Sequence, residues 1–218
     1  MSGRTAERIS PTVFVIDDDP DLRCSLQFML EQADLKVSTS QSAEEFLENC
    51  DSDMPGCLLL DVRLKGMSGL ILQKKLAELN WHLPIIIMSA YADVPMVIEA
   101  IDAGVMSFIE KPFHRNDLFS RIFKALKSDE KLRKDLARLN EIKKLFTDLT
   151  EREYQVMKMV IAGKKNEEVA QELNLSNIVV ELDLASIFRK TGVQSLAELI
   201  SLAIKSDDEL DMEIHEIW

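Results

Sequence analysis

Short apolar runs alternate with amphipathic stretches through the first half of this chain. Strands that are apolar along their whole length are buried on both faces, which is typical of a parallel sheet covered by helices on both sides. The stretches between them repeat apolar residues every three or four positions, as amphipathic helices do. The pattern predicts an α/β domain with a doubly wound, five-stranded parallel sheet. The expected strands are residues 13–17, 35–40, 57–61, 84–89 and 106–110, and the expected helices are 20–32, 42–50, 69–79, 94–104 and one that begins near 115.

Charged and hydroxyl side chains follow these strands at their carboxyl ends, where ligands of such sheets bind. Carboxylates gathered at one edge repel one another, and a hard divalent cation with oxygen ligands, such as Mg²⁺, removes that cost. A cation together with a lysine would also neutralise a phosphoryl group attached to one carboxylate. For any single residue, the alternative is a helix cap or a plain ion pair. The residues are Asp17, Asp18, Asp19, Asp61, Ser89 and Lys111.

In this order the motifs resemble the receiver domain of two-component response regulators of the NarL/FixJ family. They are DDD, LLLDVR with GMSG, MSA, DVPMVIEAIDAG and FIEKPF; one departure is LKG at 64–66, where the family commonly has Met-Pro. The resemblance implies that Asp61 is the phosphoacceptor and that Mg²⁺ is the cofactor. It also implies three ligands for this ion: Asp18 binds it directly, Asp17 binds it through water, and Arg63 binds it through its backbone carbonyl. Ser89 and Lys111 are the implied phosphoryl contacts. Phe108 is the implied aromatic switch, and the Lys111–Pro112 bond is expected to be cis.

Residues 115 to about 146 predict one long helix. Apolar positions recur at threes and fours, charges alternate around them, and neither Gly nor Pro interrupts the stretch. A stiff connector is therefore expected, which either pairs with a second chain as a short coiled coil or lies as a single helix on its own domains.

Residues 149–205 contain LT at 149–150, RE at 152–153, GK at 163–164, VA at 169–170, RK at 189–190, GV at 192–193 and AEL at 197–199. With these motifs the segment resembles the LuxR-type helix-turn-helix domain, which implies an all-α unit of four helices. Its core, cap and turn positions match, but the contact positions of the third helix do not. Where the family pattern runs S-x-x-T-V-K-x-H-x-x-x-I, Val179 replaces the threonine, Glu181 the lysine and Asp183 the histidine. Leu184 stands where Arg is frequent. Both acids are expected to face solvent, with Val180, Leu182 and Ile187 supplying the buried face.

These changes bear on DNA binding, because phosphate contacts supply nearly all non-specific affinity for DNA. Residues 149–205 carry 7 basic and 8 acidic side chains, without the basic excess of a nucleic-acid-binding domain. DNA binding in the family's usual mode is therefore expected to be degenerate, and a protein partner is the alternative. The cations left as candidate DNA contacts are Lys164, Lys165, Arg189 and Lys190.

The predicted organisation is an N-terminal tail (1–11), a receiver (12–128), a linker helix (129–148), a helix-turn-helix domain (149–205) and an acidic tail (206–218). The resemblance implies phosphorylation by a histidine kinase or phosphotransfer protein, transcriptional control and a homodimer on phosphorylation. No enzymatic activity is expected beyond self-phosphorylation and slow dephosphorylation at Asp61. The alternative function is a phosphorylation-switched protein-interaction module.

No apolar run reaches the ~18–20 residues of a membrane span, and the first ten residues lack a signal peptide's apolar core. A cytoplasmic location without membrane partners is therefore expected. Cys24, Cys50 and Cys57 lack metal-like spacing and are expected to be reduced thiols.

Overall fold

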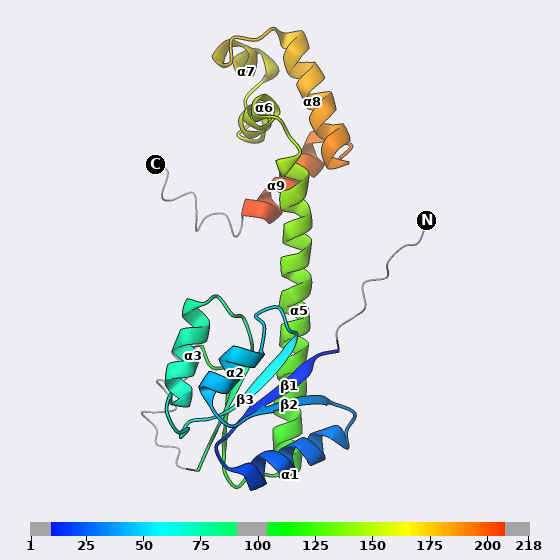
Figure 1. Ribbon diagram of the computed structural model, residues 1–218. Helices are drawn as coiled ribbons and strands as arrows, with labels where there is room; N and C mark the ends of the chain where they lie inside the picture. Colours follow the sequence, from blue (N-terminus) through cyan, green and yellow to red (C-terminus); the bar gives the residue numbers. More distant parts are fainter. Residues whose placement is uncertain (1–9, 91–103, 208–218) are drawn as a thin grey trace, which may run out of the picture. The chain divides into compact units, whose positions relative to one another are not determined.

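The structure is a computed structural model that describes residues 10–90 and 104–207 (Figure 1). It divides into two compact units, residues 1–133 and 134–218. The helix predicted at 94–104 falls outside the described residues, apart from its last position.

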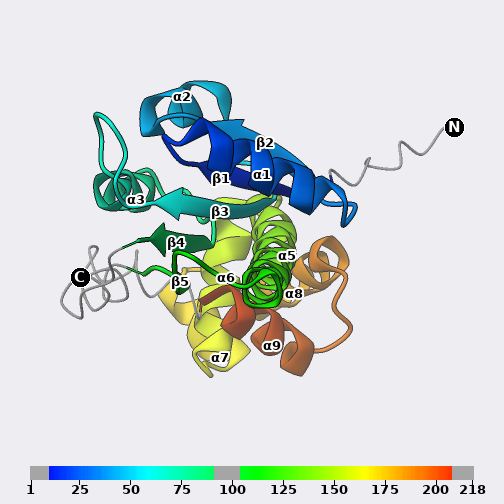
Figure 2. The same cartoon turned by 90° about the horizontal axis from the view of Figure 1, so that it is seen from below.

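The first unit contains a five-stranded sheet in the order β2-β1-β3-β4-β5, with every neighbouring pair parallel (Figure 2). This confirms the predicted doubly wound α/β fold. In this order the chain reverses direction across the sheet between β1 and β3, which is where such sheets bind ligands. The strands are β1 (Thr12–Ile16), β2 (Lys36–Ser40), β3 (Gly56–Asp61), β4 (Ile85–Ser89) and β5 (Ser107–Glu110).

Successive strand residues point to opposite faces of the sheet, and two of the described helices cover each face. Phe14 and Ile16 pack in one apolar cluster with residues of α2 and α3. Val13 and Val15 pack in the other, with residues of α1 and α5. The helices are α1 (Pro20–Glu31), α2 (Ala43–Asn49), α3 (Gly69–Glu78) and α5 (Arg115–Thr147).

Polar caps begin the helices near the carboxyl edge of the sheet. The carboxylate of Asp19 accepts hydrogen bonds from the backbone N–H groups of Asp21 (2.9 Å) and Leu22 (3.3 Å) at the start of α1. Ser42 and Ser68 cap α2 and α3 in the same way. Asp19 is therefore a helix cap, and the remaining strand-end acids form the candidate site.

Helix α5 is continuous over 33 residues, as its sequence predicts. Beyond residue 128 it is still attached to the receiver unit, because the buried Asp129 carboxylate accepts a hydrogen bond from the Gly56 N–H at 2.9 Å. Arg133 contacts the same carboxylate and donates to the carbonyls of Asp53 (2.9 Å) and Met54 (2.7 Å). The compact receiver unit accordingly includes Arg133.

Within the described residues, four helices follow α5, in agreement with the predicted all-α output domain. Thr150 and Ser176 cap α6 and α8, and Gly192 ends α8 with φ +73°, a conformation that glycine adopts easily. Their apolar faces share one core that includes Val156, Val180 and Ile187. No described helix is long and apolar enough to cross a membrane. The helices are α6 (Glu151–Ile161), α7 (Asn166–Glu172), α8 (Asn177–Thr191) and α9 (Leu196–Asp207).

Candidate phosphoacceptor site and output helix

Side chains from three strand ends meet at the carboxyl edge of the sheet. The Lys111 Nζ lies 2.6 Å from Oδ2 of Asp17, which follows β1, and 2.6 Å from Oδ1 of Asp61, which ends β3. Both carboxylates are buried, with exposed fractions of 1% for Asp17 and 7% for Asp61. Ser89, also buried, adjoins this group because its carbonyl accepts the Lys111 backbone N–H at 2.7 Å. The structure thus brings together these four residues that the sequence placed at strand ends.

The electrostatics of this cluster favour charged groups. Burial lowers the pKa of Lys111, but the hydrogen bonds and charges of Asp17 and Asp61 outweigh it and raise the pKa above its usual value. Lys111 is therefore an ammonium ion at neutral pH. One cation shared by two buried carboxylates leaves negative charge in excess, which favours an additional cation.

Local structure holds Asp61 in place from both sides. Its Oδ2 accepts the Arg63 backbone N–H at 2.7 Å, while its Oδ1 accepts from Lys111. The chain then returns to pack Gly69 on the Asp61 carbonyl, where an added Cβ would lie 2.3 Å from the oxygen. The loop between them is tied to α2, because the Glu44 carboxylate accepts the Met67 N–H at 3.0 Å, and such backbone hydrogen bonds lower the pKa of Glu44. The loop that departs from the family pattern is therefore anchored.

Asp18 lies half-buried next to this cluster. Its Oδ2 is 3.4 Å from Nζ of Lys65, whose side chain is 86% exposed, so this ion pair is loose. In the described part of the chain, no three His, Cys, Asp or Glu side chains form a ready metal cluster. Mg²⁺ does not require one, since it usually keeps several waters and takes only one or two protein carboxylates. Two buried carboxylates beside Asp18 and the carbonyl of Arg63 form an oxygen donor set that fits it.

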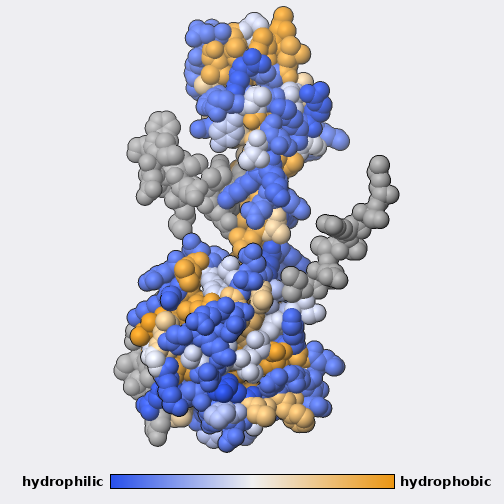
Figure 3. All heavy atoms as spheres, viewed as in Figure 1, coloured by the Kyte–Doolittle hydropathy of each residue, from blue (hydrophilic) through white to orange (hydrophobic). Residues whose placement is uncertain are grey.

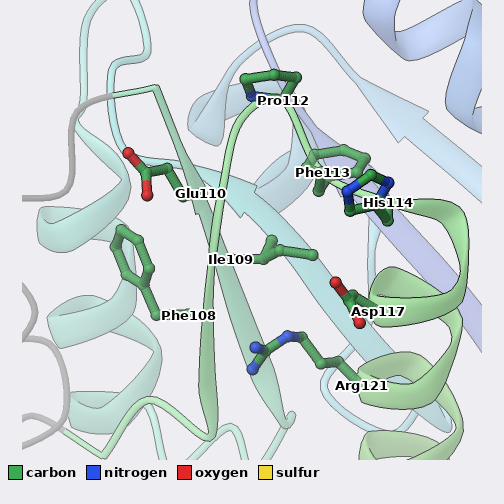
Figure 4. A pocket seen from close by; sticks show the side chains of 8 residues that line it. All are labelled: Phe108, Ile109, Glu110, Pro112, Phe113, His114, Asp117 and Arg121. Atoms are coloured by element: carbon green, nitrogen blue, oxygen red, sulfur yellow. The ribbon is translucent and has the colours of Figure 1, made fainter.

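Phe108 lies on β5, where its ring packs partly buried against the α2–α3 side of the sheet. Phe108 also lines a pocket of about 330 Å³ beside β5. In Figure 4, Ile109, Asp117 and Arg121 point toward one another on the other side of β5 from the Phe108 ring. Arg121 donates a hydrogen bond to the Ser107 hydroxyl. None of the clustered residues Asp17, Asp61 and Lys111 lines this pocket, so it is separate from the candidate site. The predicted cis Lys111–Pro112 bond is present in the structure.

Two residues of the output helix α8, Leu182 and Asp183, are placed differently from the expectation. Glu181 is exposed, while Val179 and Leu184 are half-buried. Asp183 is only 5% exposed, and its carboxylate receives two hydrogen bonds from Arg152 of α6, at 2.8 and 2.9 Å. The prediction that Asp183 faces solvent is therefore wrong, because a paired charge is tolerated on the buried face. Leu182, expected to be buried, is 64% exposed.

Carboxylates within the domain already engage two of the four candidate DNA-contacting cations. Lys164 pairs with Glu172 and Lys190 with Glu153, each at 2.6 Å. Arg189 and Lys165 are exposed. Arg189 has only a 3.5 Å contact with the Ser186 hydroxyl. Of the four candidate cations, Lys165 and Arg189 are therefore the ones left to attract DNA phosphates near α8.

Three residues with structural contacts, Asp129, Arg133 and Arg152, were not predicted from the sequence. The spacing of Asp129 and Arg133 by four positions in one helix was a recognisable signal for an ion pair. Nothing local indicated that Asp129 would also bind Gly56, or that Arg152 would bind Asp183, because these partners are 73 and 31 positions apart.

A buried aspartate facing a second acid and a lysine, on a sheet of this order followed by a four-helix unit, defines a receiver-type signalling protein with a helical output domain. Family models agree with this class. The response regulator receiver domain matches residues 13–123, and the luxR family of bacterial regulatory proteins matches residues 147–203. The chain belongs to the two-component response regulators of the NarL/FixJ type, which regulate transcription.

Individual relatives resemble the chain over nearly its whole length. Nodulation protein W of Bradyrhizobium diazoefficiens is 38% identical, over 93% of this chain and 89% of its own. Response regulator protein TodT of Pseudomonas putida is 36% identical, over 91% of this chain and 88% of its own. The solved structure of response regulator StyR matches with a TM-score of 0.81 and 37% identity, over 90% of this chain and 99% of its own.

Proposed function

We propose that Asp61 accepts a phosphoryl group from a cytoplasmic histidine kinase or phosphotransfer protein. The cluster of Asp17, Asp61 and Lys111 carries this proposal, because it places a buried carboxylate beside a lysine and a second acid. In the reaction, a carboxylate oxygen of Asp61 forms a bond to phosphorus while the bond from phosphorus to a histidine nitrogen breaks. The nitrogen keeps the electron pair of that bond.

The neighbouring residues would stabilise the charge that this transfer brings in. Asp18 would bind Mg²⁺ directly, Asp17 through water and Arg63 through its carbonyl. The bound ion would neutralise oxygens of the phosphoryl group. Lys111 already touches Asp61 at 2.6 Å, so its ammonium needs only a small shift to reach a phosphoryl oxygen. The Ser89 hydroxyl would contact another oxygen, and this change would be passed to Phe108 on the neighbouring strand.

For the output domain, we propose that α8 does not bind DNA in the family's usual mode. Glu181 is an exposed carboxylate at the usual lysine position, and Asp183 is committed to Arg152. A carboxylate facing the phosphates lowers affinity, and each missing phosphate contact lowers the salt slope by about 0.9. A protein-interaction role is the second candidate, favoured by the exposed side chains of Ile178 (69%) and Leu182 (64%) on α8.

Phosphorylation is tested by treating the full chain with a small phosphodonor and Mg²⁺ and measuring the added mass. We expect one base-labile phosphate, which is lost in Asp61→Asn and retained in the matched control Asp51→Asn, an exposed aspartate next to α2. Label that persists in Asp61→Asn, or that does not need Mg²⁺, would contradict the assignment.

DNA binding is tested by fluorescence anisotropy against a random-sequence pool over a salt series, with and without phosphodonor. The native chain should show a shallow slope or none. The variant Glu181→Lys, which restores the family's residue at an exposed position, should steepen the slope by about 0.9. Nanomolar binding of the native chain with a steep slope would show that the remaining cations are sufficient.

A further inference from the structure

Helix α8 presents one stripe to solvent, formed by Ile178, Glu181, Leu182, Ala185 and Arg189. At 3.6 residues per turn, these five positions lie within about 100° around the helix axis. Figure 3, in the view of Figure 1, shows hydrophobic residues at the surface where α7 leads into α8. Large apolar side chains that are exposed next to one another are typical of an interaction surface.

The exposed stripe carries opposite charges at equal distances from its centre. Ala185 is at its centre, with Glu181 four residues before it and Arg189 four residues after it. Among the residues that the structure describes, neither charge has an ion-pair partner within its own chain. The two large apolar residues of the stripe, Ile178 (69% exposed) and Leu182 (64% exposed), lie on the side of Glu181.

We propose that the exposed stripe binds the same stripe of a second copy of this chain, with the two α8 helices antiparallel about a two-fold axis at Ala185. Such an axis brings the Glu181 of each copy opposite the Arg189 of the other, so both charges are paired twice. A two-fold interface needs this kind of self-complementary surface. The small side chain of Ala185 lets the helices approach closely, and Leu182 then packs beside the axis.

Other occupants fit this stripe less well. DNA would place Glu181 against phosphates, and the stripe has one cation to oppose one anion, so it offers no electrostatic attraction. A strongly charged protein helix would be attracted at one end of the stripe and repelled at the other. Only a partner with the reversed order of charges matches both ends, and an antiparallel second copy has that order.

The contact is small, and this limits when it forms. A stable interface buries about 800 Å² on each partner, which is more than a single stripe of three helical turns provides. The α8 pair should therefore form when another contact already holds two chains together, since tethering raises the effective concentration to the millimolar range. In this respect the inference rests on the proposed phosphorylation at Asp61 and on the homodimer that the family resemblance implies on phosphorylation.

Cysteine cross-linking tests this geometry in the full chain. In a Cys24→Ser background, which removes the exposed native thiol, Ala185→Cys would place two thiols at the two-fold axis. A disulfide needs Cβ atoms about 3.5–4.5 Å apart. We expect a disulfide-linked dimer under mild oxidation when phosphodonor and Mg²⁺ are present, and much less without them. The control Gln171→Cys, exposed on α7 outside the stripe, should cross-link poorly in both conditions.

Charge reversal separates this pairing from a random encounter. Added to the Ala185→Cys chain, Glu181→Arg or Arg189→Glu alone should reduce the cross-link about three- to ten-fold, because each variant faces like charges. The double charge reversal should restore it, since the order of charges is then reversed but still complementary.

Mass measurement in the same samples distinguishes the two proposals. If Asp61 is phosphorylated and the Ala185→Cys chain dimerises without forming the disulfide, the α8 pairing is wrong and the phosphorylation proposal stands. If no phosphate is added to Asp61, the phosphorylation proposal is wrong, and the α8 pairing loses the phosphorylated dimer on which it rests. Protection of the introduced thiol from a thiol reagent by random-sequence DNA, instead of by phosphorylation, would identify nucleic acid as the occupant and overturn the inference.

Discussion

Arg152 of α6 and Asp183 of α8 form a two-pronged ion pair, with Nε 2.8 Å from Oδ2 and Nη2 2.9 Å from Oδ1. These hydrogen bonds and the charge of Asp183 raise the pKa of Arg152. Asp183 is almost fully buried, so its carboxylate fastens two helices of the output domain to each other. An aspartate at a position where the family has histidine therefore has a structural role here.

The stability of the output domain should depend on Asp183 and not on its exposed neighbour. Asp183→Ala removes both hydrogen bonds from Arg152 and should lower the free energy of unfolding by about 1–3 kcal/mol. Glu181→Ala, the matched control on the same helix, should change it by less than about 0.5 kcal/mol. Urea unfolding measures the stability change of both variants, and hydrogen exchange of the α6 and α8 amides shows whether the change lies in these helices. Equal effects of the two substitutions would argue against the ion pair.

Glu153 should make the output domain sensitive to acid. Burial raises the pKa of Glu153, but hydrogen bonds from Lys190, Ser186 and Thr150 outweigh it and lower the pKa from 4.5 to about 2. A carboxylate with a lowered pKa stabilises the fold above its unfolded pKa, and this contribution is lost as the pH falls from about 4.5 towards 2. Its size is on the order of 3 kcal/mol.

This pH dependence is isolated by comparing the native chain with Glu153→Gln. The variant should be less stable at pH 7, and the difference between the two chains should shrink steadily below pH 4.5. Unfolding in urea at several pH values provides the measurement. A difference that stays constant down to pH 2 would mean that Glu153 titrates normally.

Asp129 should hold the start of β3 to α5. Asp129→Ala leaves the buried Gly56 N–H without its acceptor, which should cost about 1–3 kcal/mol of receiver stability. The Gly56 amide should also exchange its hydrogen faster. Asp135→Ala, at an exposed position of the same helix, is the control and should leave both quantities unchanged. Unaltered exchange at Gly56 in the Asp129 variant would refute this contact.

Mg²⁺ binding should distinguish the two acids that follow β1. Asp18→Asn should weaken the binding of Mg²⁺ more than Asp17→Asn does, because Asp18 is the proposed direct ligand and Asp17 acts through water. The existing contacts agree with this order, since Asp17 is held by Lys111 at 2.6 Å and Asp18 only loosely by Lys65 at 3.4 Å. Titration calorimetry with Mg²⁺ tests the ranking. A larger loss in Asp17→Asn would exchange their roles.

Local patterns in the sequence were sufficient for the architecture and for the candidate phosphoacceptor site. Continuously apolar strands require cover on both faces, so the parallel sheet follows from the runs that became β1, β3 and β4. Because the carboxyl ends of parallel strands share one edge, Asp17, Asp61 and Lys111 had to lie near one another. The same holds for α5, whose uninterrupted periodicity predicts its length.

Tertiary structure decided which side of α8 is buried. The sequence period allowed both Leu182 and Asp183 on the inner face, and hydrophobicity alone favoured Leu182. In the folded domain Asp183 is buried because Arg152 reaches it from another helix, and Leu182 is exposed because no described helix covers it. A buried charge is tolerated only where a partner compensates its lost hydration. That partner is 31 positions away, so only the packing of α6 against α8 determines it.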